Sequence, residues 1–378
     1  MMAKAPGSKG FDLEELLRAY FIRAGFFVAR GVPLQYAGED LTDIDIWLYE
    51  RPTGSSRRRQ ILDAKSKNKP KAAERLFWTK GLMELLNVDG AYVATTDARP
   101  LLRAMSKQLG ISLLDGADLR RIGSSDKVAF PDRLTEEEFL LKISRFDKIR
   151  RDRSVHAAYS DVKSALIDNF GAHTLNRALD TLGALASLAV SLHPNSEDAE
   201  LACRVSYFAA SITALAIDFV SSEFSFRTVD ERKTAILNAI RFGNSDAVAG
   251  RERINLAVGL LRRYGPQGEA TGHAVEAAVM RDIQQIPAEI IGDYVAKNSK
   301  QDELFQIARR LEHVAFSKRL QSFDALGSEE KSFIAALLDF CGVDRSRFAK
   351  SWTAASTGGQ SASVYEAESL FSDGKGKS

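Results

Sequence analysis

The chain of 378 residues is 45% hydrophobic, which is enough for a sizeable core and predicts two or three domains. Its formal net charge of +2 is close to neutral, so any attraction to a charged partner must come from local clusters. The two cysteines are far apart and lie in no ligand-spaced cluster, and the start carries no apolar signal-type stretch. We therefore expect a reduced, cytoplasmic protein without structural zinc.

The first predicted element is an amphipathic helix over residues 12–24, because its leucines and aromatic residues recur at helical spacing. Gly25 is expected to end this helix in a left-handed conformation. The segment FFVARGV then predicts a strand. The segment YAGEDLTD predicts a polar turn that leads into the next strand.

The stretch over residues 42–67 carries the residues of greatest chemical interest. TDIDIWLYE predicts a strand with aliphatic side chains on one face and with Asp43 and Asp45 on the other. ILDAKSK predicts a second strand that places Asp63 and Lys65 on a common face. The turn-rich RPTGSS spacer lets the two strands pair as a hairpin, so two carboxylates and a lysine are expected to converge.

This set of side chains suits the hydrolysis of a phosphodiester. The reaction needs a hard divalent cation, and Mg²⁺ is commonly held by one or two carboxylates while water and substrate take the other positions. Asp45 and Asp63 would supply the carboxylates. The ammonium of Lys65 would position the attacking water and offset charge that develops on the phosphate. The expected cofactor is Mg²⁺ or Mn²⁺.

The following elements alternate between helix and strand. A helix is predicted over residues 72–86, with Lys80 and Glu84 on one face a turn apart. The strand GAYVATT, a helix over residues 99–109 and the segment ISLLDGADLRRI come next, and the last predicts a strand, an acidic turn and a short helix. This alternation predicts a mixed α/β sheet covered by helices.

An acidic residue, a spacer and then D-x-K, in this order of elements, resemble the PD-(D/E)xK nuclease superfamily of restriction endonucleases, Holliday-junction resolvases and Mrr-type enzymes. The resemblance covers roughly the first 125 residues and implies a restriction-endonuclease-like fold. It implies that Asp45 and Asp63 bind the metal and that Lys65 assists the water. It also implies an outer carboxylate at Glu14, eleven residues before Gly25, with Glu15 as the neighbour that could replace it.

The resemblance adds two weaker expectations and leaves one choice open. The carbonyl of Ala64 is expected as a third metal ligand, and Lys80 matches a helix position where the family often places Lys or Gln. A surface pair with Glu84 explains Lys80 equally well. Ile44 stands where the family has proline, so Asp43 competes with Asp45 as the first metal ligand.

A structural interpretation of the same residues also stands. Asp43 and Asp45 could be the polar face of an exposed strand, and Asp63 with Lys65 an ion pair that adds little stability. A separate alternative is a catalytically inactive, nuclease-like adaptor that binds nucleic acid and acts through its helical domain.

Basic residues gather around the predicted carboxylates. Arginines fill the hairpin spacer, and lysines then recur at every second residue. Phosphate contacts from such residues give affinity without sequence information. Arg58, Lys67, Lys69 and Lys80 are the expected nucleic-acid contacts, and a solvated loop is the alternative.

A domain boundary is predicted near residues 123–133, after which helices follow one another. The predicted segments are 136–169, 173–192, 197–222, 230–242, 246–264, 272–298, 300–320 and 328–340. The apolar run over residues 205–220 is too short for a membrane span and contains Asp218, so we expect a buried helix and no membrane. The five histidines do not cluster.

The chain is therefore predicted to hold a nuclease-like domain over residues 1–125, an all-α domain over 126–350, and a disordered tail over 351–378. The expected function is metal-dependent hydrolysis of DNA, with RNA as an alternative substrate. The Mrr resemblance implies defence against foreign DNA. The helical domain is expected to select the substrate, hold a homodimer, or dock onto a partner subunit.

Overall fold

The computed structural model describes residues 9–36, 39–65, 71–124, 130–150, 154–297 and 303–353. The chain divides into two compact units. The first contains Met1–Pro52 and Arg58–Glu137, and the second contains Thr53–Arg57 and Glu138–Thr353. Most of the predicted tail, residues 354–378, lies outside the described residues.

The first unit follows the predicted order of helices and strands. Its elements are α1 (Lys9–Arg23), β1 (Phe27–Tyr36), β2 (Glu39–Glu50), β3 (Arg58–Lys65), α2 (Ala72–Leu85), β4 (Gly90–Thr95), α3 (Pro100–Leu109), β5 (Ser112–Leu114) and α4 (Gly116–Gly123). Gly25 follows α1 with a φ of 97°, as a left-handed terminating glycine does.

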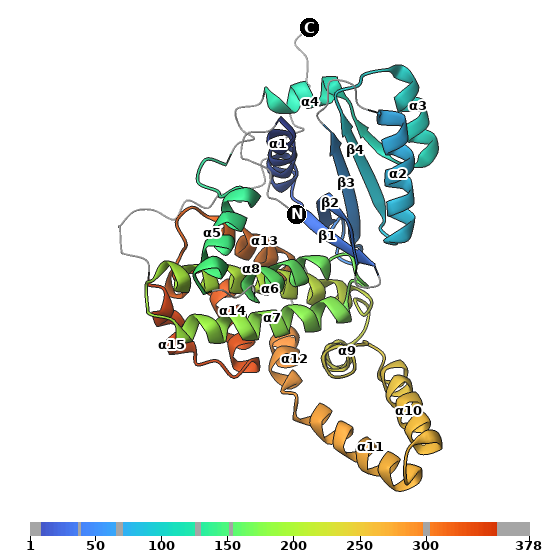
Figure 1. Cartoon of the computed structure of the whole chain (residues 1–378), viewed down its shortest axis with the longest axis vertical. Helices are drawn as coiled ribbons and strands as arrows, with labels where there is room; N and C mark the ends of the chain where they lie inside the picture. Colours follow the sequence, from blue (N-terminus) through green and yellow to red (C-terminus); the bar gives the residue numbers. More distant parts are fainter. Residues whose placement is uncertain are drawn as a thin grey trace. The chain divides into compact units, whose positions relative to one another are not determined.

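The five strands form one mixed sheet in the order β1-β2-β3-β4-β5, which confirms the predicted mixed α/β sheet. β1, β2 and β3 pair antiparallel, whereas β3, β4 and β5 pair parallel. Helix α1 packs on the face that carries Ile46 and Leu62, and α2 lies on the other side of the sheet (Figure 1). Both faces are covered, so the centre of β3 is buried from Gln60 to Ala64.

The polar segment before Asp45 differs from the prediction. YAGEDLTD was expected as a turn, but β1 runs to Tyr36 and β2 begins at Glu39, with Gln35 paired to Asp40 and Leu34 to Thr42. The pairing of β1 with β2 continues into this segment because the side chains of this part of β2 face solvent. Polar residues there lose no hydration when the two strands pair. The hairpin is therefore longer than its hydrophobic pattern suggests.

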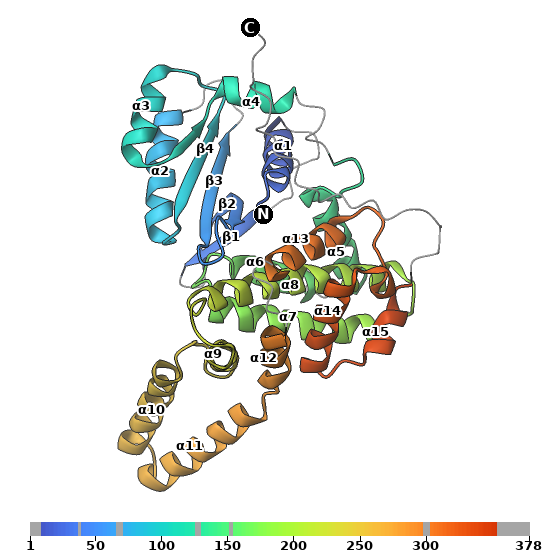
Figure 2. The same ribbon diagram turned by 180° about the vertical axis from the view of Figure 1, so that it is seen from behind.

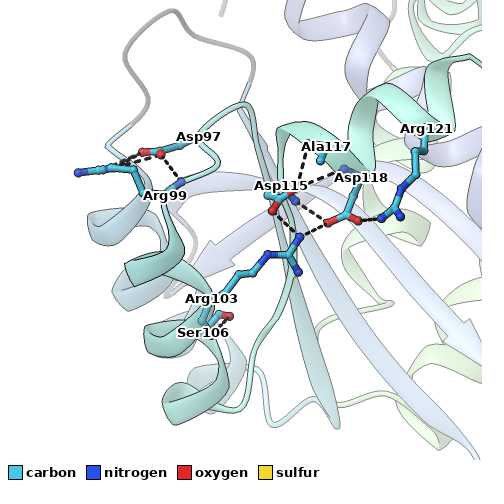
Figure 3. A network of polar contacts seen from close by, with 8 residues as sticks. All are labelled: Asp97, Arg99, Arg103, Ser106, Asp115, Ala117, Asp118 and Arg121. Carbon is cyan, nitrogen blue, oxygen red and sulfur yellow. Dashed lines mark hydrogen bonds and ion pairs between the residues drawn. The ribbon is translucent and has the colours of Figure 1, made fainter.

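The predicted acidic turn caps α4. The carboxylate of Asp115 accepts hydrogen bonds from the backbone N–H groups of Ala117 (2.8 Å) and Asp118 (3.2 Å), and the carboxylate of Asp118 accepts one from the backbone N–H of Asp115 (3.1 Å). Arg103 of α3 pairs with both carboxylates (Figure 3). Burial opposes ionisation of Asp115, but these donors hold its pKa below the usual range. A reciprocal cap thus fixes the end of β5 to α4.

Helices make up the regular structure described in the second unit, as predicted. They are α5 (Glu136–Arg150, whose first two residues belong to the first unit), α6 (Ser154–Ser164), α7 (Ala172–Ser191), α8 (Glu197–Ser222), α9 (Val229–Phe242), α10 (Ala247–Tyr264), α11 (Gly268–Gln285), α12 (Ala288–Lys297), α13 (Glu303–Phe316), the 3₁₀ turn η1 (Phe323–Ala325), α14 (Ser328–Phe340) and α15 (Arg345–Ser351).

Two helix predictions need correction, and one helix was missed. The segment 272–298 is two helices, because Pro287 lacks the N–H that a continuous helix would need and α11 ends before it. The segment 136–169 holds two helices, and the second ends at Ser164 rather than at Asn169, which has a left-handed φ of 49°. Helix α15 was not predicted.

Helix α8 forms the core of the second unit. It packs against α7 and α13 (Figure 2), and Phe208 on it joins an aromatic cluster with Tyr159 and Phe316. It is long and apolar enough to cross a membrane, but 83% of its most apolar window is buried within the structure. The predicted buried helix over residues 205–220 is thus confirmed.

Candidate functional site

Asp45 and Asp63 lie at corresponding positions on neighbouring strands. The last described pair of β2 and β3 in this direction is Ile46 with Leu62, so the two aspartates are the next residues on each strand. There the carboxylate of Asp45 replaces the backbone as hydrogen-bond partner, because its Oδ2 accepts from the N–H of Ala64 at 2.7 Å. The end of the β2–β3 ladder therefore brings together two of the predicted site residues.

Opposing electrostatic effects act on the pKa of Asp45. Burial raises its pKa above the ordinary value, while the Ala64 N–H and the positive charges of Lys65, Arg75 and Arg30 lower it in part. Lys65 follows Ala64 at the end of β3, and its side chain is partly exposed. The predicted lysine is thus close enough to act on the carboxylate of Asp45 through its charge.

Asp63 is 6% exposed and is engaged by an arginine that the sequence analysis did not single out. Arg75, in the first turn of α2, donates from Nε to Oδ2 at 2.7 Å, and its Nη2 contacts the other carboxylate oxygen. This bidentate geometry is the one in which arginine binds carboxylates and phosphates most strongly. The only sequence signal for it was a basic residue at the start of the helix that follows D-x-K.

Glu14 pairs with an arginine of β1. Its carboxylate accepts from Arg30 of β1, at 2.9 Å from Nε and 2.8 Å from Nη2. Burial raises the pKa of Glu14, and the charge of nearby Asp45 adds to this shift while Arg30 opposes it. Because alternate residues of a strand face opposite sides, Asp63 points away from the α1 face that Leu62 occupies. The charge of Asp45 thus reaches Glu14, whereas the carboxylate of Asp63 pairs with Arg75 of α2.

Glu15 uses the same arginine more tightly. Arg30 Nη1 donates to Glu15 at 2.6 Å, Arg18 donates at 3.2 Å, and the backbone N–H of Glu136 adds a third bond at 3.2 Å. Burial of Glu15 opposes ionisation, but these groups lower its pKa to about 2. Glu137 also pairs with Arg30, at 2.7 Å. Glu15 is therefore held by donors from α1, β1 and the start of α5.

The remaining predicted residues are less closely grouped. Lys80 pairs with Glu84 at 2.7 Å, as the surface alternative anticipated. The side chain of Arg58 is 58% exposed and lies 3.8 Å from Glu50. Asp43 is exposed, and Ala64 is buried and aligned with Ala94 of β4. Lys67 and Lys69 lie outside the described residues.

The donor set at the ladder end fits a hard cation only in part. Two carboxylates on adjacent strands, with the Ala64 peptide directly after Asp63, offer oxygen ligands of the kind that Mg²⁺ takes. Within the described parts of the chain, however, no group of three or more His, Cys, Asp or Glu side chains is placed to hold a metal. The Arg75 guanidinium supplies the positive charge beside Asp63 that a cation would otherwise supply.

Replacing Arg75 by Gln should therefore tighten metal binding about three- to tenfold, because a competing cation is removed from Asp63 and a positive charge from its surroundings. Titration calorimetry with Mg²⁺ and Mn²⁺ measures this change. Arg99→Gln is the matched control, since Arg99 also pairs with an aspartate of this unit, Asp97, at 2.7 Å. Equal affinities for wild type and Arg75→Gln would show that Asp63 does not bind the metal.

Comparisons of this chain with protein-family models, with characterised proteins and with solved structures found no match.

Proposed function

We propose that the chain is a metal-dependent nuclease that hydrolyses phosphodiester bonds of DNA. The observation that carries this proposal is the position of Asp45 and Asp63 side by side at the end of the β2–β3 ladder, with the charge of Lys65 acting on Asp45. The element order of helix, three strands, helix and strand supports assignment to the restriction-endonuclease-like fold, with RNA as the alternative substrate.

Each residue would have a distinct role. Asp45 and Asp63 would hold Mg²⁺ or Mn²⁺, together with the carbonyl of Ala64, and the bound metal would polarise the phosphate and acidify a water molecule. Lys65 would orient the attacking water and offset negative charge on the phosphate. Glu14 would act as an outer carboxylate through its effect on Asp45. Lys80 and Arg58 would contact the nucleic-acid backbone.

The cellular setting follows by analogy alone. We assign the protein to the cytoplasm and to defence against foreign DNA, with the helical unit selecting the substrate, holding a homodimer or docking onto a partner subunit. Each of these assignments depends on the nuclease proposal.

The test is cleavage of supercoiled plasmid, linear duplex, single-stranded DNA and RNA with and without Mg²⁺ or Mn²⁺. We expect cutting of at least one DNA substrate that stops when the metal is chelated and returns when it is restored. Cutting that persists after chelation, or none on any substrate while calorimetry detects no metal binding, would refute the metal-dependent nuclease.

One observation favours a second function. The Asp63–Arg75 ion pair satisfies the buried carboxylate without a metal, as a nuclease-like adaptor that only binds nucleic acid would require. Such an adaptor would bind DNA with the same affinity in the presence and absence of Mg²⁺. It would also leave every substrate intact.

A further inference from the structure

The outer edge of α2 carries an exposed aromatic side chain next to two cations. Lys71, Arg75 and Trp78 are spaced at i, i+4 and i+7, so they lie on one side of the helix. The buried residues of α2 are Ala72, Leu76, Thr79 and Leu82. Trp78 is 49% exposed, whereas Trp47 is fully buried and Trp352 is half-buried. The core of this unit therefore does not account for the position of Trp78.

The middle residue of this edge contacts the candidate site. Arg75 is the residue that engages Asp63, and Trp78 lies one turn further along the same side of α2. Lys71 is 76% exposed and pairs with Glu74 at 3.0 Å, an exposed contact that adds little stability and exchanges readily for another anion. Lys71 and Trp78 thus lie on either side of the arginine that contacts Asp63.

We propose that this edge of α2 binds an unpaired nucleic-acid strand, with Trp78 stacking on a base and with Lys71 and Arg75 contacting adjacent phosphates. The proposal rests on the proposed function, which places a phosphate at Asp63, and it names the substrate class as single-stranded. Sites for single strands combine cations along the backbone with aromatic rings on which bases stack. In a duplex the base faces are already stacked on their neighbours, so Trp78 would have no face to bind.

The experiment measures binding in chelator, so that cleavage does not enter the result. Labelled single-stranded oligothymidylate and a duplex of equal length are titrated with protein and followed by fluorescence anisotropy. The part of the tryptophan quenching that disappears in Trp78→Ala reports the stacking, because Trp47 and Trp352 also emit. We expect tighter binding of the single strand. Trp78→Ala should weaken that binding about 5- to 100-fold, and Trp78→Phe should restore most of it.

Leu85→Ala is the matched control. Leu85 is 56% exposed and lies two turns beyond Trp78 on the same side of α2, so its loss should leave binding unchanged. Lys71→Ala should reduce the slope of log affinity against log salt by about 0.7, the value for one phosphate contact on a single strand. Thermal melting checks that each variant is folded.

Equal affinity of Trp78→Ala and wild type for the single strand, or no quenching of Trp78, would overturn this inference. Metal-dependent cutting of duplex DNA that is insensitive to Trp78→Ala would overturn it too and leave the nuclease standing. Binding through Trp78 without cleavage of any substrate would support the strand-binding edge and refute the nuclease.

Discussion

Asp63→Asn is expected to lower Mg²⁺-dependent cleavage by about 10³-fold or more. Loss of a metal ligand removes several kcal/mol of transition-state stabilisation, and each 1.36 kcal/mol corresponds to about a factor of ten in rate. Lys65→Ala is expected to cost about 10²- to 10³-fold, as loss of a single group that stabilises developing charge does. Initial rates on the substrate that wild type cuts best give both values.

Two surface substitutions in the same unit are the controls. Asp97→Asn removes a carboxylate that pairs with Arg99, and Lys107→Ala removes an exposed lysine of α3. Both should cut at the wild-type rate. Calorimetry adds a second readout, because Asp63→Asn should lose metal affinity while Lys65→Ala should keep it. If Asp63→Asn and Lys65→Ala both retain full activity, the reacting centre lies elsewhere in the protein.

Arg30→Met is expected to produce the largest loss of stability, about 3–5 kcal/mol in the free energy of unfolding. Arg30 is 3% exposed and neutralises Glu14, Glu15 and Glu137 together. Without it, three neighbouring carboxylates of α1 and α5 repel one another in a region from which water is largely excluded. Urea denaturation at neutral pH measures the change. Arg121→Met is the control because Arg121 is 77% exposed and Asp118 keeps Arg103 as a second partner, so its loss should change little.

The loss caused by Arg30→Met should shrink in acid. In wild type the pKa of Glu15 falls from its ordinary 4.5 to about 2, so its contribution to stability is present above about pH 4.5 and is lost as pH falls towards 2. In the variant the carboxylates lose their cation and can take up protons instead. Denaturation curves from pH 7 to pH 3 should therefore converge for the two proteins. A difference that stays constant over this range would show that Arg30 acts through packing rather than through charge.

The elements of this protein were largely predictable from local pattern. Helical spacing predicted α1, α2 and the buried α8, and alternation predicted the strands that carry Asp45 and Asp63, since side-chain periodicity depends only on backbone geometry. Local pattern missed the helix break at Pro287, because that break depends on a single residue. It also missed the start of β2 at Glu39, because that part of the strand is polar. The sequence also predicted that Asp45 and Asp63 would lie together, because a hairpin aligns neighbouring strands.

The partners of those side chains were decided only by the tertiary structure. Arg75 reaches Asp63 because α2 packs across β3, and Arg30 gathers Glu14, Glu15 and Glu137 although more than a hundred residues separate the last from the arginine. No spacing rule connects such positions, because the folded chain, and not the helix or strand repeat, sets these distances. The sequence therefore determined which groups stand at the end of the ladder, whereas packing determined that an arginine faces Asp63 and that Glu14 is turned towards Arg30.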